Sequence, residues 1–329
     1  GAGLAVALVS VIQHLRRFVV AERRPPRPAR QPRPEALPVP APVSLAPFAG
    51  PILVPVANPA TAPALVRLAS TLAAGDPSVE LVALKVVVAP KGARLEEARR
   101  YHLSMQEQYE GALAEAMRWA AAQGVALRAE IQVAGDVASG ILHFAEGVPN
   151  PGLILLGWRG AVSLRRVRRS VNQEIVSSAR CHVAVLRERS LGPIRRVLVP
   201  VGWGPHVRFG LRLAERFVQH EGAQLTALRI LPATGDVDWE AERKAVLNLL
   251  EAETPGLRHG TELRLVRERA VVPAILTEAR RGAYDLLIIG ASDQWWLRNW
   301  LFGAIPDLIA EQAPCSVLLV RRYEPSRSA

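Results

Sequence analysis

The stretch that decides the fold is LILLGWRGAVSLRRVRRSVNQEIVSSARCHVAVLR, residues 153–187. It returns near the C-terminus as LLIIGASDQWWLRNWLFGAIPDLIAEQAPCSVLLVR, residues 286–321. Each copy predicts a buried strand that ends in Gly, a loop, a short helix, and a Cys before a second apolar strand. A strand that ends in Gly and leads to a helix N-terminus commonly holds a phosphate group. The presence of two copies indicates that the chain is a duplication.

Outside these two stretches, apolar runs alternate with segments of helical periodicity in the same order. Continuous apolar runs such as ILVPV (52–56) and VLVPV (197–201) predict strands that are covered on both faces. The alternation of strands and helices predicts an α/β fold with two tandem, doubly wound parallel sheets. The predicted strands are 52–56, 79–88, 125–133, 153–156, 197–201, 224–231, 262–267 and 285–289, and the predicted helices are 62–74, 94–123, 137–147, 207–218, 239–252 and 273–281.

Length and composition narrow the class of protein. The chain has 329 residues, half of them hydrophobic, which suits two domains and an additional segment. Its formal net charge is +11. A basic chain can bind nucleic acid, anionic lipid or nucleotide, whereas a compositional bias toward Ala, Arg, Pro and Val explains the charge equally well. The sequence has no zinc-finger spacing, aromatic RNA-binding signature or recognition-helix pattern, so we expect no nucleic-acid partner.

The first residues carry a membrane signal. Residues 1–22 begin with the uncharged run GAGLAVALVSVI, and arginines follow it, an order typical of a transmembrane helix that exits on the cytoplasmic side. The run is too short to span a bilayer, so we interpret residues 1–22 as the end of a longer membrane helix; an amphipathic or disordered leader is the alternative. Residues 23–47, rich in Pro and Arg, predict a disordered linker. Its arginines would contact anionic lipid beside such a helix and would otherwise form a solvated tail.

Both halves resemble the universal stress protein family. The resemblance rests on the first strands ILVPV and VLVPV, the strand–Gly segments, and the endings SVNQEIVSSARCHVAVLR and GAIPDLIAEQAPCSVLLVR. It covers residues 51–187 and 195–322 and implies universal-stress-like domains at 48–190 and 194–323, followed by a tail at 324–329. The family fold implies that each domain has a five-stranded parallel sheet with helices on both faces.

The resemblance also implies partners and a location. Family members pair through their last strand, so we expect internal pairing of the two domains. Tandem copies also occur fused to the cytoplasmic ends of membrane transporters. We therefore expect the tail of a transporter on the cytoplasmic side of the membrane, with its own transmembrane domain as a partner. A cytoplasmic protein without a membrane segment is the alternative.

Nucleotide-binding members of the family carry an acid after the first strand and a G-x2-G-x9-G-[ST] loop after the fourth. The acid binds a polar edge of adenosine, and the glycines let backbone N–H groups approach the phosphates. In the first copy Gly157 and Gly160 match the loop. With one residue deleted, Arg169 stands at the third Gly and Ser170 at the hydroxyl position. The acid position is Ala57.

In the second copy Gly290 and Gly303 match, but Asp293 replaces the second Gly and Ala304 the hydroxyl residue. The acid position is Gly202. An Asp carboxylate in a phosphate loop repels the ligand, at a cost of about 1 kcal/mol or more. We therefore assign no cofactor firmly. We expect ATP or another adenine nucleotide to bind at most weakly to the first copy, and the second copy to bind none or an altered ligand.

Two groups of loop residues have two interpretations each. The arginines of the first loop either attract an anion or form a solvated basic loop; they are Arg159, Arg165, Arg166, Arg168 and Arg169. The tryptophans of the second loop either contact a transporter, the other half or a bilayer edge, or they fill the empty phosphate site. They are Trp295, Trp296 and Trp300.

The sequence predicts no catalytic residues. GxSxG, HExxH and HxGH motifs are missing, and the histidines are scattered. Asp136 would either line the cleft or serve as a turn residue, and the turn is the simpler interpretation. Cys181 and Cys315 stand at matching positions and are interpreted as small buried thiols. We therefore expect a non-catalytic regulatory or interaction module, with a nucleotide-binding stress protein that uses the first loop as the alternative.

Overall fold

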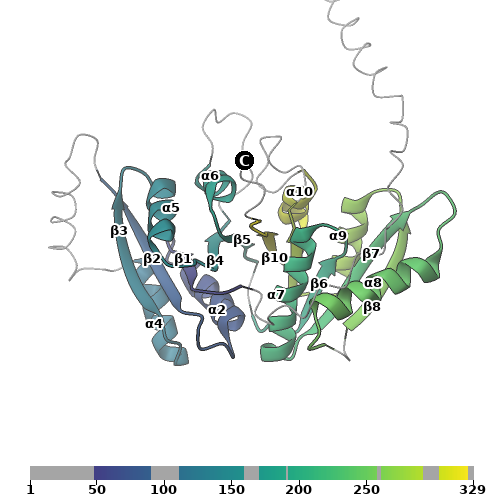
Figure 1. The fold of residues 1–329 in the computed structure, drawn as a ribbon, viewed down its shortest axis with the longest axis horizontal. Coiled ribbons are helices and arrows are strands. Elements are labelled where there is room, and N and C mark those ends of the chain that lie inside the picture. Colours follow the sequence, from purple (N-terminus) through teal and green to yellow (C-terminus); the bar gives the residue numbers. More distant parts are fainter. Residues whose placement is uncertain are drawn as a thin grey trace, which may run out of the picture. The chain divides into compact units, whose positions relative to one another are not determined.

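A computed structural model describes residues 48–89, 111–158, 170–189, 192–257, 261–291 and 304–324. Their strands form one sheet in the order β3-β2-β1-β4-β5-β10-β9-β6-β7-β8 (Figure 1). The strands are β1 (Ile52–Pro55), β2 (Leu81–Val88), β3 (Arg128–Ala134), β4 (Leu153–Gly157), β5 (His182–Arg187), β6 (Arg196–Pro200), β7 (Gln224–Pro232), β8 (Thr261–Glu268), β9 (Leu286–Gly290) and β10 (Ser316–Arg321). The helices are α2 (Ala62–Ala73), α4 (Ala112–Gln123), α5 (Val137–Gly147), α6 (Val171–Ser178), α7 (Pro205–Glu221), α8 (Trp239–Glu253), α9 (Val271–Arg281) and α10 (Ala304–Gln312).

The predicted fold class is confirmed. Within each half every strand pairing is parallel, and the order 3-2-1-4-5 of the first half is repeated in the second. Helices α2, α4, α7 and α8 contribute to one hydrophobic core, and α5, α6, α9 and α10 contribute to the other. Along β1, Ile52 and Val54 belong to the first core and Leu53 to the second, and all three are fully buried. This two-sided burial explains the continuous apolar run of the sequence.

The two halves join through their last strands, as the family resemblance implied. Strands β5 and β10 pair antiparallel, with Ala184 opposite Val320 and Leu186 opposite Leu318. These four residues belong to the core that α2 and α7 cover, while their neighbours Val185 and Leu319 belong to the other. Both cores therefore continue across the junction, and residues from Ala46 onward form one compact unit.

Arginines at equivalent strand ends reinforce the junction. Arg321, which ends β10, donates from Nη2 to the carbonyl oxygens of Ala179 and Cys181, at 2.7 Å each. Arg187, which ends β5, donates from Nη2 to the carbonyl oxygen of Glu311 at 3.0 Å. The last carbonyls of a helix have no partner within it, so donors from elsewhere stabilise them. In each half, the carbonyl groups near the end of the last helix accept hydrogen bonds from an arginine of the other half.

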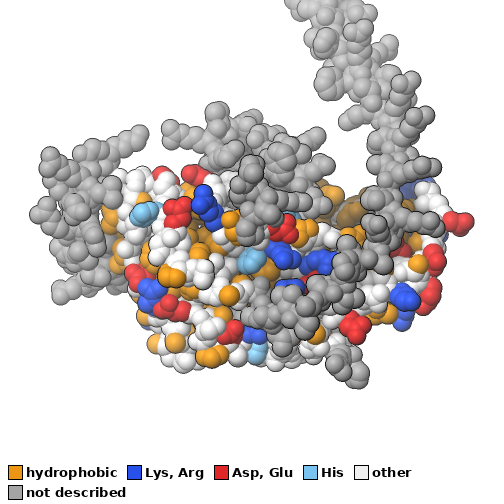
Figure 2. All heavy atoms as spheres, viewed as in Figure 1, with side chains coloured by type: hydrophobic (Ala, Val, Ile, Leu, Met, Phe, Trp, Pro, Cys, Tyr) orange, Lys and Arg blue, Asp and Glu red, His pale blue; other side chains and the backbone are white. Residues whose placement is uncertain are grey.

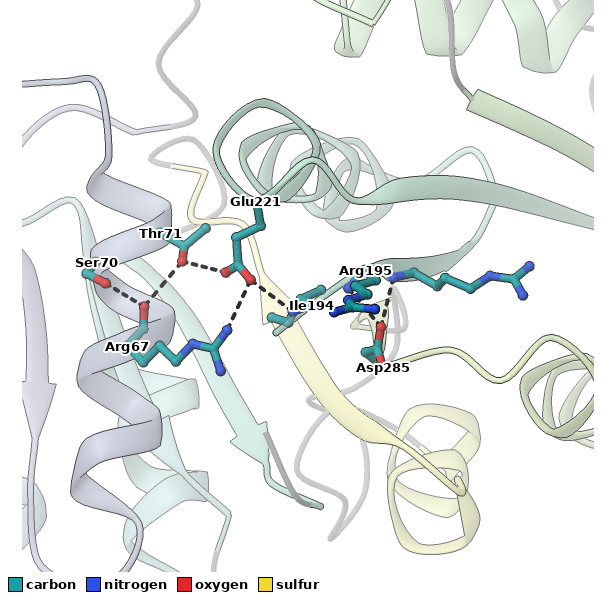
Figure 3. Close-up of polar contacts among 8 residues, drawn as sticks. Arg67, Ser70, Thr71, Ile194, Arg195, Glu221 and Asp285 are labelled. Atoms are coloured by element: carbon teal, nitrogen blue, oxygen red, sulfur yellow. Dashed lines mark hydrogen bonds and ion pairs between the residues drawn. The ribbon is translucent and has the colours of Figure 1, made fainter. Parts of the chain in front are cut away.

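A second polar contact between the halves centres on Glu221, at the end of α7 (Figure 3). Its carboxylate accepts hydrogen bonds from Thr71 Oγ1 at 2.7 Å and from Arg67 Nη2 at 3.2 Å, both on α2. It also accepts from the backbone N–H of Ile194, in the connection between the halves, at 2.9 Å. One largely buried carboxylate thus fixes α2, α7 and the connecting segment.

Helix α7 is longer than the sequence predicted. It begins at Pro205 rather than Val207, because Pro is well suited to the first helical position. It ends at Glu221 rather than Val218, before Gly222, which takes the left-handed conformation (φ 68°) that closes many helices.

Several predicted segments lie outside the described residues. They are the leader (1–22), the linker (23–47), the first part of the predicted helix 94–123, and most of the tail at 324–329. The structure describes the end of that predicted helix as α4.

The Glu221 contact gives a stability prediction. Replacing Glu221→Ala leaves the Ile194 N–H and the Thr71 hydroxyl without their acceptor, so we expect the free energy of unfolding to fall by about 2 kcal/mol. Urea unfolding measures the change. Glu251→Ala, on the exposed surface of α8, is the control and should leave stability unchanged. Equal effects of the two substitutions would show that the contact contributes nothing.

Candidate functional site

The first half has a cleft at the carboxyl ends of its central strands. β1 lies between β2 and β4, so the strand order reverses there, and open α/β sheets bind ligands at such a reversal. The cleft has a volume of about 520 Å³. Its walls are mainly apolar side chains, including Val56, Leu84, Val86, Val137, Ile141 and Leu156, and its polar lining residues are Asn58, Thr61 and Asn172.

Of the predicted site residues, Gly157 lines the cleft, and Ser170 directly precedes Val171 and Asn172, which also line it. Gly157 lines the cleft at the end of β4, and its carbonyl accepts a hydrogen bond from Asn172 Nδ2 at 3.0 Å. Ser170 is the N-cap of α6: its Oγ accepts from the N–H of Gln173 at 3.2 Å, and its own N–H donates to Gln173 Oε1 at 3.0 Å. This capping box fixes the start of α6, which holds Asn172 against Gly157.

The other predicted loop residues cannot be placed. Gly160, Arg169 and Gly303 lie outside the described residues. So do the remaining loop arginines and the three loop tryptophans, whose alternative interpretations therefore stay open. Asn172 was not predicted as a site residue, and its position two residues after Ser170 was the only local signal for it.

In the second half, α7 covers the equivalent place. A side-chain carbon added to Gly290 would lie 2.8 Å from the backbone of both His206 and Val207, whereas one added to Gly157 would first meet Leu65, at 3.6 Å. His206 Nδ1 accepts a hydrogen bond from the N–H of Arg322 at 3.0 Å, which joins the start of α7 to the end of β10. The first turn of α7 therefore lies directly against the end of β9.

The position of the missing acid in the second half is followed by an aromatic side chain. Trp203 comes after Gly202, and the guanidinium of Arg229 lies 5.0 Å from its ring centre. Arg229 also pairs with Glu242 at 2.9 Å. Arg229 therefore already interacts with a carboxylate and an aromatic ring, and its positive charge is largely compensated within the protein.

Two cysteines and one histidine near the junction are held in neutral forms. Burial raises the pKa of the Cys181 and Cys315 thiols to about 11, and both cysteines are free. Burial and the nearby positive charge of Arg322 lower the pKa of His182 to about 4, and its Nδ1 accepts from the N–H of Tyr323 at 3.0 Å. Within the described ranges no group of His, Cys, Asp and Glu side chains is arranged to hold a metal ion.

Asp136 has a structural role. It is the N-cap of α5, and its carboxylate accepts from the backbone N–H of Ser139 at 2.9 Å and from the Ser139 hydroxyl at 2.5 Å. These hydrogen bonds lower the pKa of the carboxyl group. The simpler interpretation, a residue that organises the turn, is the one that the structure supports.

The open, doubly wound α/β sheet is present here in two copies, and in the first copy a cleft lies at the strand-order reversal. A model of the universal stress protein family matches residues 49–187 and matches again at residues 193–321. The chain therefore belongs to the universal stress protein family and contains two tandem domains of it.

Solved structures are similar to this chain at low sequence identity. A universal stress protein from Archaeoglobus fulgidus DSM 4304 is 18% identical with a TM-score of 0.59, covering 85% of this chain and 98% of its own. A protein from Pseudomonas aeruginosa UCBPP-PA14, named for the same family, is 17% identical with a TM-score of 0.52, covering 84% and 94%. The cytoplasmic domain of a prokaryotic cation chloride cotransporter is 16% identical with a TM-score of 0.49, covering 84% and 96%. Among curated proteins, none matches this sequence.

The difference between the two halves gives a prediction. In Gly290→Ala the new methyl group meets the backbone of α7, so we expect the free energy of unfolding to fall by about 2 kcal/mol. Gly157→Ala is the matched control at the equivalent strand end and should change stability little, because its methyl group enters the cleft. Urea unfolding of both variants tests this, and equal destabilisation would contradict the difference in packing.

Proposed function

We propose that this chain is a non-catalytic regulatory module in which the first universal stress domain binds a small ligand and the second domain has a structural role. The observation that supports this proposal is the asymmetry of the two strand ends. The first half keeps a cleft of about 520 Å³, whereas the first turn of α7 lies against Gly290 in the second. A duplicated domain with one open cleft is suited to sensing a ligand and passing the effect to its partner.

The side-chain chemistry around the cleft favours binding over catalysis. A nucleophile or general base needs a pKa near the working pH and a free lone pair. The cleft is lined by aliphatic side chains and by neutral Asn58, Thr61 and Asn172. Asp136, which directly precedes the cleft residue Val137, caps the N-terminus of α5 with its carboxylate. These groups can orient a ligand through hydrogen bonds, and none of them is suited to proton transfer.

An adenine nucleotide is the ligand class that we propose for the cleft. Its apolar walls and few polar groups suit a flat heteroaromatic ring. The resemblance to nucleotide-binding family members supports the same choice. Ala57 replaces the acid that would bind the polar edge of adenosine, so the interaction should be weak.

Calorimetric titration of ATP into the full chain tests the cleft. We expect binding with a Kd of about 0.1 to 1 mM and no release of ADP. Gly157→Val should abolish binding, because two extra methyl groups would project toward Leu65 within the cleft. Gly192→Val is the control, since Gly192 is exposed and a Cβ atom added to it would have no described atom within 4 Å. A failure of ATP and adenosine to bind at millimolar concentration would retire the nucleotide proposal.

We further propose that the module acts at the cytoplasmic face of a membrane, as part of a transporter. The support lies in the sequence, where the apolar residues of the leader precede a Pro- and Arg-rich linker. Among the described helices, none has the length and hydropathy that a membrane span requires. On the face shown in Figure 2, Lys and Arg atoms lie beside Asp and Glu atoms at several places. The linker sequence, by contrast, is rich in arginine.

Vesicle co-sedimentation tests the membrane proposal. We expect the full chain to bind vesicles that contain phosphatidylserine, with binding that weakens as salt increases, because each arginine near an anionic surface contributes about 1 kcal/mol. Replacing Arg23, Arg24, Arg27, Arg30 and Arg33 by Gln should remove this salt-sensitive part. A soluble nucleotide-binding stress protein, the second candidate, would bind ATP and would not bind the phosphatidylserine vesicles.

A further inference from the structure

A second hollow adjoins the cleft of the first half. It has a volume of about 410 Å³ and is lined in part by Thr61, Leu65, Gly157 and Trp158, which also line the cleft. The two spaces are therefore adjacent at the end of β4. The second hollow differs in its remaining lining, which comes from the end of β5 and the residues that follow: Leu186, Arg187, Glu188 and Arg189.

The guanidinium groups of Arg187 and Arg189 each have more N–H donors than the hydrogen bonds described below require. Nη2 of Arg187 donates to the carbonyl oxygen of Glu311 at 3.0 Å, and Nη2 of Arg189 approaches the same oxygen at 3.4 Å. Two cations thus share one neutral acceptor. Nη1 of Arg187 is buried and has no acceptor among the described residues. A buried guanidinium nitrogen without an acceptor is costly, so the charge of Arg187 is only partly compensated by the described residues.

The equivalent arginine of the second half shows what a purely structural role looks like. Arg321 is 7% exposed, and its Nη2 satisfies two carbonyl oxygens of the other half. Arg187 is partly exposed, satisfies one carbonyl oxygen and borders an open space. The duplication therefore placed an arginine at both strand ends, and the arginine of the first copy lines a hollow.

Two carboxylates and one helix end also lie near the two arginines. Glu188 is the carboxylate of its described lining and offsets one of the two arginines. The Glu311 carboxylate also acts on Arg187. On the opposite wall, Thr61 is the N-cap of the twelve-residue helix α2, and its side chain makes no capping hydrogen bond to the helix. The positive end of the α2 dipole therefore adds to the two guanidinium groups.

We propose that this hollow is an anion site in which Arg187 and Arg189 bind a phosphoryl group. The planar guanidinium fork matches phosphate oxygens in geometry and charge. Because the hollow adjoins the apolar cleft, we place the heteroaromatic ring of one ligand in the cleft and its phosphates between the arginines. The phosphates then bind at the end of β5, away from the start of α6. The assignment of ring and phosphate to one ligand rests on the proposed nucleotide cleft.

Such a ligand would act on the junction of the halves. The two arginines that bind the phosphate also contact the carbonyl oxygen of Glu311, in the last turn of α10. A phosphate that draws the guanidinium groups toward the hollow would alter their hydrogen bonds to the second half. Occupancy of the first domain is thereby transmitted to the second domain through Arg187 and Arg189.

The test compares three ligands in calorimetric titrations of the full chain: adenosine, ATP and inorganic tripolyphosphate. We expect ATP to bind about tenfold more tightly than adenosine, and tripolyphosphate to bind alone. Arg189→Gln and Arg187→Lys should remove most of the ATP advantage and of tripolyphosphate binding while leaving adenosine binding unchanged. Arg118→Gln, an exposed arginine on α4, is the charge-matched control for Arg189→Gln and should change none of the three. Thermal melting of each variant checks that it remains folded.

The outcomes separate the two proposals. Equal affinity for ATP and adenosine, or an ATP advantage that survives both arginine variants, would overturn the anion site and leave the nucleotide cleft standing. Binding of tripolyphosphate without adenosine, lost in the arginine variants, would support the anion site and overturn the cleft as an adenine site. Binding of none of the three would overturn both.

Discussion

The antiparallel pairing of β5 with β10 is the constraint on which the rest of the structure depends. Residues 183–186 and 317–320 are apolar and are buried to 2% exposure or less. Either strand alone at a sheet edge would expose a fully apolar ladder, which invites aggregation. The outer strands β3 and β8 have the opposite character: they alternate charged and apolar residues, and Arg128 and Arg264 form ion pairs there. Strand composition therefore determines which edges meet and which face solvent.

Local sequence patterns predicted the elements of the fold, and the family resemblance predicted how the halves pair. Helix α5 has the predicted bounds, because its apolar spacing and its cap both lie within a few residues. The role of Ser170 could also have been recognised, since Gln173 follows at the spacing of a capping box. The contact of His206 with Arg322 could not, because 116 residues separate the partners and neither position carries a local signal. The closure of the second strand end depends on such contacts, so it required the structure.

The two halves differ because small changes in helix position act at a tightly packed strand end. Helix α7 begins at Pro205, five residues after β6 ends at Pro200, whereas α2 begins at Ala62, seven residues after β1 ends at Pro55. The shorter connection places the first turn of α7 against Gly290, and the longer one leaves space beside Gly157. A glycine kept at both strand ends thus has two physical causes. In the second half it permits close backbone packing, and in the first it keeps a cleft open.

A half whose strand end is covered by the first turn of α7 can still be essential to the other. The second domain covers the apolar edge of β5, supplies Glu221 to α2, and offers the Glu311 carbonyl to the arginines at the end of β5. Removing it would expose the β5 edge and free the two arginines that border the second hollow. The geometry of the first domain's binding region is therefore set partly by the second domain. Because a ligand that moves Arg187 must also change a contact with α10, binding and domain pairing share the same guanidinium groups, and neither can change without affecting the other.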